Sequence, residues 1–534
     1  MKIAKQHTPV LIVGAGPSGL MMAAQLLRNG VQPIIIDSKQ GPTTQSKALA
    51  VQARSLEIYR QLGVVDTVIQ NGKQGAGLIF NINDKEQARL PINNIGEGQT
   101  PFPYVLVYQQ YKNERVLLDY LTQNCCPVYW ETSLETVTET AGKATVTLVS
   151  SGEKTTLTCN WLIGADGAHS VVRKQAGIPF NGDTYPRTFY LADLNLNTSL
   201  GDYIDLYLSK DGFAAIFPMP EDKRYRLIGN LPDTLADKED ITVEDILPGM
   251  EQVTGAKQQV TECHWLTTYK LHHRMADKFR SGRSFLIGDA AHVHSPVGGQ
   301  GMNTGLQDAY NLAWKLAGVV KGQFNELILD SYADERMPVA KRLLNTTDTA
   351  FNIIMKRNIF VNFFKSHMMP GLLKFLWARE GLKKEFFKIL SQTGISYRDS
   401  KLNMHLGRGS KIKAGDRLPY LKIFDEKKQT ETDLHQWCAQ PGFTFIAMGK
   451  IAEMDLFSLA KWINQTYPQL LNFYYLPLSS KNQHVFDAFE ITSPQPRTIL
   501  VRPDMHIGLI NDGINTDIIR NYMDNVVEVL SRES

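Results

Sequence analysis

Two short apolar runs flank a helical stretch at the start of the chain. Residues 9–13 and 33–36 are runs of strand length, and residues 20–28 between them are good helix formers that end at Asn29 and Gly30. Because two parallel strands joined by a helix give this order, the pattern predicts a β-α-β unit. The second predicted strand ends at Asp37.

The turn between the first predicted strand and its helix has the sequence GAGPSG. In a G-x-G-x-x-G turn the first glycine permits the tight bend, the second lets the backbone approach a pyrophosphate, and the third lets helix and strand come close. An acid at the end of the second strand can accept hydrogen bonds from a ribose diol. The strand and helix around the motif favour dinucleotide binding over a chance match. The residues assigned to this site are Gly14, Gly16, Ser18, Gly19 and Asp37.

A second pattern covers residues 282–317. Residues 285–287 predict a short strand that ends at Gly288 and Asp289, and a glycine-rich loop follows. The glycines let a backbone lie against a flat ligand, and the next helix start, expected near Met302, offers free N–H groups and partial positive charge. These features suit a hydroxylated, partly anionic cofactor. The apolar residues of that helix recur on one face: Leu306, Ala309, Tyr310, Ala313 and Ala317.

A third pattern lies at residues 161–176. A buried strand at 161–163 leads into the sequence GADGAHS, which contains Asp166, and a helix containing Arg173 is expected at 171–176. No second G-x-G-x-x-G follows a strand. The chain is therefore expected to have one dinucleotide fold, and a nicotinamide cofactor would dock without a fold of its own.

These three patterns resemble, in the same order, the motifs of the FAD-dependent aromatic hydroxylases, the single-component monooxygenases of the p-hydroxybenzoate and phenol hydroxylase type. The resemblance implies that Asp289 holds the ribityl chain of FAD and that the backbone of residues 299–303 faces the flavin. It also implies that Asp166 lies at the FAD diphosphate, near the route of the nicotinamide, with Arg173 beside it. The residues that inherit cofactor contacts around the second pattern are Gly288, Asp289, Pro296, Gly299, Gly301, Met302 and Asn303.

Two further segments match the family less closely. Lys47, followed by Ala48, stands where the family has arginine, and lysine is a point charge without a planar fork. Arg54 is a second candidate for that positive charge, with a surface helix charge as the alternative. Gln110 and Glu114 resemble the family's glutamine-x-x-x-glutamate, in which the glutamine touches FAD, and helix capping is the alternative.

Residues 179–274 change to short strands, which the resemblance implies are a substrate domain covering the flavin. Tyr203, Phe217 and Met219 are candidates for contact with an aromatic ring, and ordinary core packing is the alternative. Arg226 is a candidate for binding an anionic substrate group, and a charge at the sheet edge is the alternative. The predicted strands are 188–196, 203–208, 214–218 and 225–230.

The last part of the chain is predicted to be helical at 330–390, with breaks at Pro338 and Pro370. Residues 401–534 resemble the thioredoxin-like C-terminal domain of the longer hydroxylases, but their single cysteine, Cys438, excludes disulfide exchange. The expected strands there are 443–448, 473–476 and 498–501, and the expected helices are 454–465 and 516–530.

The expected fold class is α/β. A Rossmann-like FAD-binding domain (1–178 and 275–400, the second part with a helical region) holds an inserted β-sheet substrate domain (179–274). The thioredoxin-like domain (401–534) follows it.

Composition and charge mainly exclude certain partners and sites. A net charge of +3 on 534 residues gives no electrostatic case for nucleic acid. The aromatic stretch 360–377 is interrupted by charges and a proline, so we expect a packed helical hairpin, or else a subunit contact, and no membrane span. Five sparse cysteines indicate a reducing compartment, which favours a cytoplasmic protein. His292 and His294 have no third ligand at a recognisable spacing, so no metal site is expected.

The resemblance implies a flavoprotein monooxygenase. NADPH or NADH would reduce FAD, O2 would add to give a C4a-hydroperoxyflavin, and a phenolic substrate would be hydroxylated. The sequence identifies no catalytic base. The alternatives are a monooxygenase of a polyketide, antibiotic or alkene substrate, or a flavin-binding regulatory protein with little turnover. A homodimer is a possible further association.

Overall fold

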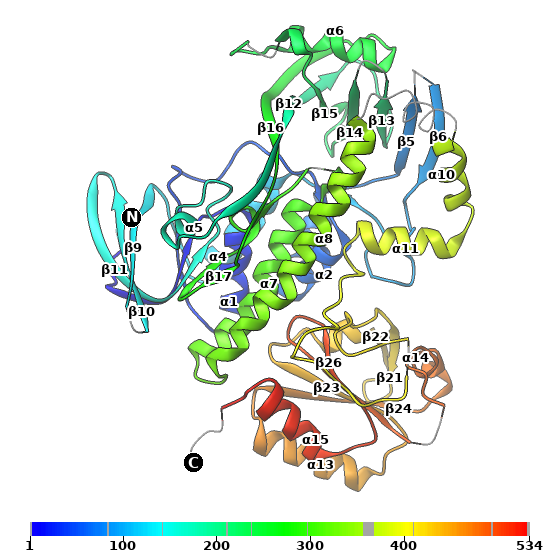
Figure 1. Cartoon of the computed structure of the whole chain (residues 1–534). Helices are drawn as coiled ribbons and strands as arrows, with labels where there is room; N and C mark the ends of the chain where they lie inside the picture. Colours follow the sequence, from blue (N-terminus) through cyan, green and yellow to red (C-terminus); the bar gives the residue numbers. More distant parts are fainter. Residues whose placement is uncertain are drawn as a thin grey trace.

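An eight-stranded sheet forms the centre of the first part of the molecule (Figure 1). The computed structural model describes residues 3–82, 85–140, 142–209, 212–235, 238–295, 297–355, 368–409, 411–492 and 495–530. Strand β1 (His7–Val13) lies between β2 (Ile34–Ile36) and β11 (Glu153–Gly164), and all three are parallel. With α1 (Pro17–Arg28) as the crossover, the predicted β-α-β unit is confirmed. The other strands are β8 (Val128–Tyr129), β9 (Thr132–Thr140), β10 (Lys143–Ser150), β17 (Arg280–Ser281) and β18 (Ser284–Leu286).

Helix α7 (Gly301–Val320) packs against α1 beside this sheet, and it begins where the sequence predicted. All five residues of its predicted apolar face are buried, but so are polar residues such as Asn303 and Asp308. The helix is therefore enclosed on every side. The shorter helices of this part are α2 (Ala53–Leu62), α3 (Val65–Gln70), α4 (Gln110–Gln123) and α5 (Val171–Gln175).

A second eight-stranded sheet lies above the first in Figure 1, in the order β19-β16-β12-β15-β14-β13-β5-β6. The long strands β12 (Phe180–Leu196) and β16 (Val260–Ala276) extend into it from the first part. Because β5 (Gly77–Ile82) and β6 (Lys85–Pro91) also join it, the sheet is larger than the predicted segment 179–274. Helix α6 (Val243–Thr254), which the sequence analysis did not predict, covers one of its faces. The remaining strands are β13 (Tyr203–Leu208), β14 (Phe213–Pro218), β15 (Arg224–Asn230) and β19 (His292–Val293).

The predicted break at Pro338 is wrong, because α8 (Asp330–Met355) continues through it. Proline removes one helical hydrogen bond, but packing of the buried residues on either side, Arg336 and Ala340, keeps this helix continuous. Pro370 lies in the first turn of α10 (Met369–Trp377), where proline is tolerated.

Helix α10 packs on α11 (Glu380–Leu390), while residues 356–367 of the expected hairpin lie outside the described residues. Within the described part of the chain, no helix has the length and apolarity needed to cross a membrane.

The C-terminal part is a five-stranded mixed sheet in the order β20-β26-β25-β23-β24. The three predicted strands are confirmed, whereas β26 (Ile507–Asp512) was not predicted. The predicted helix 516–530 is too long, because α15 (Thr516–Asn521) gives way to a π-helical turn, Tyr522–Val526. The other elements of this sheet and its flanking helix are β20 (Met404–His405), β23 (Phe443–Gly449), β24 (Leu471–Pro477), β25 (Arg497–Val501) and α13 (Glu453–Thr466).

A buried carboxylate joins the C-terminal part to α2. Glu57 accepts hydrogen bonds from Arg54 at 2.9 Å and from Arg417 at 3.0 Å. Burial alone would raise the pKa of Glu57, but the charges of Arg417, His435 and Arg54 lower it to about 2. The interface therefore depends on an ionised Glu57.

The pH dependence of this contact gives a first prediction. Glu57→Gln leaves the buried Arg54 and the part-buried Arg417 without their anion, so we expect it to lower the free energy of unfolding by about 3 kcal/mol at pH 7. A carboxyl with a lowered pKa stabilises the fold above its ordinary pKa of 4.5 and loses that effect as the pH falls towards about 2. In denaturant titrations, the difference between wild type and variant should narrow below pH 4.5. A constant difference would contradict this assignment, and Glu385→Gln, in an exposed pair on α11, is the control.

Candidate functional site

The first glycine turn brings β1 close to α1 and leaves one side open. A Cβ atom on Gly14 would lie 2.3 Å from the carbonyl oxygen of Ala165, and one on Gly19 would lie 1.9 Å from the carbonyl oxygen of Gly14. Both positions therefore require glycine. A Cβ atom on Gly16 would meet no atom within 4 Å. The start of α1 has no side-chain cap, so its free N–H groups and the open side of Gly16 suit a phosphate group.

Asp37 fixes this turn from the end of β2. One of its carboxylate oxygens accepts a hydrogen bond from the Ala15 N–H at 2.7 Å, and the other accepts one from the Lys39 N–H at 2.9 Å. A carboxylate has further lone pairs that can accept hydrogen bonds. The ribose contact of Asp37 stays a prediction, and its structural function is to hold the glycine turn.

Asp289 is exposed between two buried neighbours, Gly288 and Ala290. No described residue donates a hydrogen bond to its carboxylate. Protein crowded around the group raises the pKa of Asp289, although His292 and Lys47 nearby act in the opposite direction. The carboxylate thus has an open side and protein on the others, as expected of a group that accepts hydrogen bonds from a ligand.

The second motif lies directly against the first. A Cβ atom on Gly288 would lie 2.4 Å from the hydroxyl oxygen of Ser18, and Gly288 itself has a φ of +58°. The Gly288 N–H donates to Asp308 on α7 at 3.1 Å. The structure therefore brings together the start of α1 and the turn that carries Asp289.

The glycine loop before α7 is held by two amide side chains. Asn303 donates to the carbonyl oxygens of Gly299 at 2.8 Å and Ala50 at 2.9 Å, and it accepts from the Gln52 N–H at 2.9 Å. The Gln52 side chain donates to the carbonyl oxygen of Gly298 at 3.0 Å. The Asn303 side chain is thus committed to the protein, and it fixes the loop backbone that is predicted to face a cofactor.

The other residues predicted for this loop give less support to a cofactor site. Met302 packs against the core at the first turn of α7, Gly301 begins that helix, and Pro296 lies outside the described residues. Gln52 was not predicted as a site residue, because its one local signal is a polar residue between a strand and a helix.

The third motif caps a helix and connects two loops. Asp166 accepts hydrogen bonds from the Ser170 hydroxyl and from the N–H groups of Val171 and Val172, so it caps α5. Burial raises the pKa of Asp166 despite these hydrogen bonds. Arg173 is buried and donates to the carbonyl oxygen of Ala290 at 2.8 Å, next to Asp289. Arg173 is therefore a buried charge that connects two loops, not a solvated charge on a surface helix.

The two candidates for a positive charge have different environments. Arg54 is fully buried and donates to Glu57 and to the carbonyl oxygen of Asp504 at 2.7 Å, so its charge is neutralised at the C-terminal interface. The alternative for Arg54, a charge on a surface helix, is therefore wrong. Lys47 is exposed and near enough to Asp289 to affect its pKa. Of these two candidates, Lys47 is therefore the one whose positive charge is available to a cofactor bound near Asp289.

Gln110 is engaged with the protein at the start of α4. Its side-chain oxygen accepts from the Ala48 N–H at 3.3 Å, and its amide donates to Glu114 at 2.9 Å. It thus holds the segment that follows Lys47.

The predicted substrate residues do not share one pocket. Phe217 and Met219 cluster with Leu49 and Val107, which link the second sheet to the small sheet of β3 (Ala50–Val51), β4 (Lys73–Gln74) and β7 (Leu106–Val107). Side chains alternate along a strand, and the pairing places Tyr203 on the face covered by α6, opposite to Phe217. Tyr203 stacks instead on Arg89.

Arg226 is not at the sheet edge, because β15 lies between β12 and β14. It is fully buried and forms two hydrogen bonds with Asp193, at 2.7 and 2.8 Å. Its charge is therefore already neutralised. Among the residues described, no cluster of three histidine, cysteine or acidic side chains could hold a metal ion.

The exposed carboxylate gives the second prediction. If Asp289 binds the FAD that the resemblance implies, Asp289→Ala should weaken FAD binding at least about tenfold, because a charged hydrogen-bond acceptor is lost. Reconstitution of the apoprotein followed by flavin fluorescence measures this. Asp399→Ala, at another exposed aspartate, should leave affinity unchanged. Equal affinity in wild type and Asp289→Ala would refute the assignment.

Comparisons with known proteins agree with this arrangement. A family model described as "FAD binding domain" matches residues 7–347. The chain is 36% identical over 408 residues to 6-methylpretetramide 4-monooxygenase of Streptomyces rimosus, covering 75% of this chain and 72% of that protein. It is 31% identical to pentachlorophenol 4-monooxygenase of Sphingobium chlorophenolicum over 439 residues, 80% of this chain and 79% of the relative.

Solved structures show the same fold. The OxyS anhydrotetracycline hydroxylase from Streptomyces rimosus superposes with a TM-score of 0.79 at 24% identity, and the flavin-dependent monooxygenase PieE, in complex with FAD and substrate, with 0.81 at 20%. Each comparison covers 98% of this chain and 99% of the other. The chain belongs to the FAD-dependent aromatic hydroxylase family and is a flavoprotein monooxygenase that uses FAD to hydroxylate aromatic substrates.

Proposed function

We propose that the substrate is a phenol with more than one ring, hydroxylated with NADPH or NADH and O2 as co-substrates. Bound FAD supplies the redox chemistry, accepting a hydride and, with O2, transferring one oxygen atom to an electron-rich ring. The observation that supports a large substrate is a continuous, partly open apolar face on the second sheet.

The residues described above suit FAD. Asp289 would accept hydrogen bonds from the ribityl hydroxyls, and the start of α1, open at Gly16, would bind the pyrophosphate. The N-terminal N–H groups of α7, after the loop held by Asn303, would stabilise negative charge on the flavin ring. Lys47 would add positive charge on the side of Asp289.

The open face of the second sheet is apolar across several strands. Phe80 on β5 pairs with Leu206 on β13, which pairs with Ala215 on β14, and Ala215 pairs with Ile228 on β15. Phe80, Leu206 and Ile228 are only partly buried. The opposite face is packed under α6. An apolar face left partly open is a candidate surface for an aromatic ligand.

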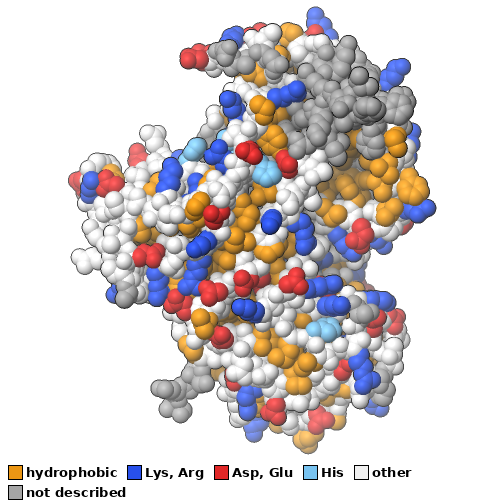
Figure 2. Space-filling model, viewed as in Figure 1, with side chains coloured by type: hydrophobic (Ala, Val, Ile, Leu, Met, Phe, Trp, Pro, Cys, Tyr) orange, Lys and Arg blue, Asp and Glu red, His pale blue; other side chains and the backbone are white. Residues whose placement is uncertain are grey.

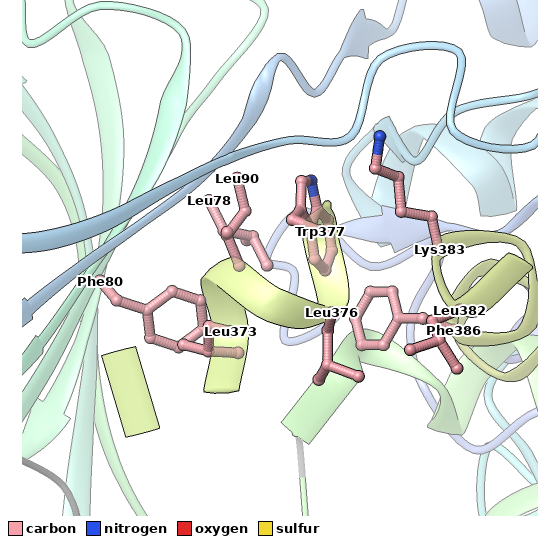
Figure 3. A pocket seen from close by; sticks show the side chains of 9 residues that line it. All are labelled: Leu78, Phe80, Leu90, Leu373, Leu376, Trp377, Leu382, Lys383 and Phe386. Atoms are coloured by element: carbon pink, nitrogen blue, oxygen red, sulfur yellow. The ribbon is translucent and has the colours of Figure 1, made fainter. Parts of the chain in front are cut away.

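A pocket of about 80 Å³ continues this face between the sheet and α10 (Figure 3). Leu78, Phe80 and Leu90 line its sheet side, and Leu373, Leu376, Trp377, Leu382, Lys383 and Phe386 line its helix side. One strand, β13, separates Phe80 from the strand of Phe217, so the two strands lie roughly 10 Å apart. A substrate that contacts both residues needs more than one ring.

The relatives support both sizes of substrate. The name 6-methylpretetramide 4-monooxygenase indicates a substrate larger than a single-ring phenol, whereas pentachlorophenol, the substrate named for the second relative, has one ring. The separation of Phe80 and Phe217 on the apolar face supports the first type here.

A homodimer would have a suitable surface on the outer side of α10 and α11, where hydrophobic side chains gather at the right of Figure 2. Leu372, Phe375 and Ile389 are among the exposed residues there. We propose this surface for a homodimer because apolar patches of this kind commonly mark contacts between proteins.

A substrate series supplies the third prediction. Multi-ring phenols should stimulate NADPH oxidation and gain one oxygen atom by mass spectrometry. Phe80→Ser should raise the KM for these substrates about tenfold, through lost apolar contact, and leave the KM of single-ring phenols unchanged. Tyr203→Ser, an aromatic residue on the opposite face, is the matched control and should change neither KM. Stimulation by single-ring phenols alone would contradict the proposed substrate class.

A further inference from the structure

The C-terminal domain is joined to α8 by a buried ion pair. Arg502 donates two hydrogen bonds to the carboxylate of Glu335, at 2.6 and 2.8 Å, and a third to Asp504 at 2.6 Å. All three side chains are buried. Lys315 of α7 also donates to Glu335, at 2.8 Å. One carboxylate therefore connects the C-terminal domain with both α7 and α8.

Asp504 adds a direct contact with α7. Its carboxylate accepts hydrogen bonds from Trp314 at 3.2 Å and from Asn311 at 3.4 Å. Its backbone carbonyl accepts one from Arg54 of α2 at 2.7 Å. The segment around Asp504 is thus bonded to two helices of the cofactor-binding part.

A second buried carboxylate lies nearer to the cofactor site. Asp308 of α7 accepts hydrogen bonds from the Gly288 N–H at 3.1 Å, from His292 at 2.8 Å and from Arg336 of α8 at 2.7 Å. Gly288 directly precedes Asp289. The position of Asp289 therefore depends on where α7 and α8 place Asp308 and Arg336.

The two clusters are connected through the chain and through space. Glu335 and Arg336 are consecutive residues of α8, so one helical turn carries the anchor of each cluster. Arg336 also donates to the Tyr397 hydroxyl at 3.0 Å, and the Tyr397 ring packs on the His506 ring with centroids 4.2 Å apart. A continuous set of buried contacts thus links Arg502 to the turn of Asp289.

Buried ion pairs of this kind fix geometry, because either partner left alone is strongly unfavourable in the interior. The thiol chemistry associated with thioredoxin-like domains is not available here. Cys438 is the only cysteine of this domain, it is buried, and burial raises its pKa to about 12. The contacts of this domain, rather than a redox group, therefore carry its connection to the active site.

We propose that Arg502 and Asp504 are positioning residues of the flavin site. Through Glu335 and α7, they hold Asp308 where it presents the Asp289 turn to FAD. This inference rests on the proposed contact between Asp289 and the ribityl chain. The C-terminal domain therefore contributes to FAD affinity and to coupling of NADPH oxidation to hydroxylation, without touching the cofactor.

The test uses the full-length protein and three readouts: the FAD dissociation constant, the ratio of hydrogen peroxide released to NADPH consumed, and the melting temperature of the apoprotein. Arg502→Gln should weaken FAD binding about tenfold, a usual size for coupling between linked sites, and raise the peroxide ratio. Arg497→Gln is the matched control. Arg497 is a buried arginine of the same domain that pairs with Asp512 inside that domain. It should lower the melting temperature but change FAD affinity less than about twofold.

Equal weakening of FAD binding by Arg497→Gln, or wild-type affinity in Arg502→Gln, would overturn the inference. If Arg502→Gln does not fold, Asp504→Asn, which keeps the side-chain shape, should reproduce the loss of affinity, and wild-type affinity there would also overturn it. Asp289→Ala distinguishes a failure of this inference from a failure of the proposed cofactor contact. If Asp289→Ala weakens FAD binding and Arg502→Gln and Asp504→Asn do not, only this inference is refuted. If Asp289→Ala does not weaken FAD binding, the proposed contact between Asp289 and FAD is itself refuted.

Discussion

The structure depends on the satisfaction of buried polar groups along one helix. Helix α7 is enclosed by protein, so each polar side chain on it needs a partner. Asn303 donates to the glycine loop, Asp308 accepts from the Gly288 N–H, and Trp314 donates to Asp504 of the C-terminal part. These partners lie in three different parts of the chain. A single helix thereby fixes two cofactor loops and the C-terminal domain relative to one another.

In this arrangement, the side chains that hold the cofactor loops in place are different from the side chain that is open to a ligand. Asp37, Asp166 and Asn303 are occupied by backbone N–H or carbonyl groups of the protein, whereas Asp289 remains open. The polar side chains of the motifs therefore mostly build the loops, and these loops are proposed to offer backbone groups and one carboxylate to FAD. The aromatic substrate is proposed to meet a different surface, the apolar face of the second sheet. A substrate bound on such a face would be shielded from water on that side, and an oxygen-transfer reaction needs water to be kept away.

The sequence predicted the elements whose signals are local. The β-α-β unit, the strand before Gly288 and the start of α7 all combine short-range periodicity with glycines that have no substitute at close approach, as Gly14 and Gly19 show. It also predicted an arrangement of motifs that identifies the family.

Contacts between distant segments could not be predicted in this way. Arg54 was a candidate for a positive charge near the flavin but pairs with Glu57 beside Asp504, and Arg226 was considered for a substrate anion but pairs with Asp193. Pro338 was expected to end a helix that packing keeps continuous. In each case residue type was informative, and the partner that decided its role lay far away in sequence or was set by tertiary packing.

The most direct test of the proposed cofactor site is a crystal structure of the full chain with FAD bound. It should show the Asp289 carboxylate within about 3.2 Å of a ribityl hydroxyl, with the Asp308 to Gly288 hydrogen bond retained. FAD bound with its ribityl chain away from Asp289 would contradict it.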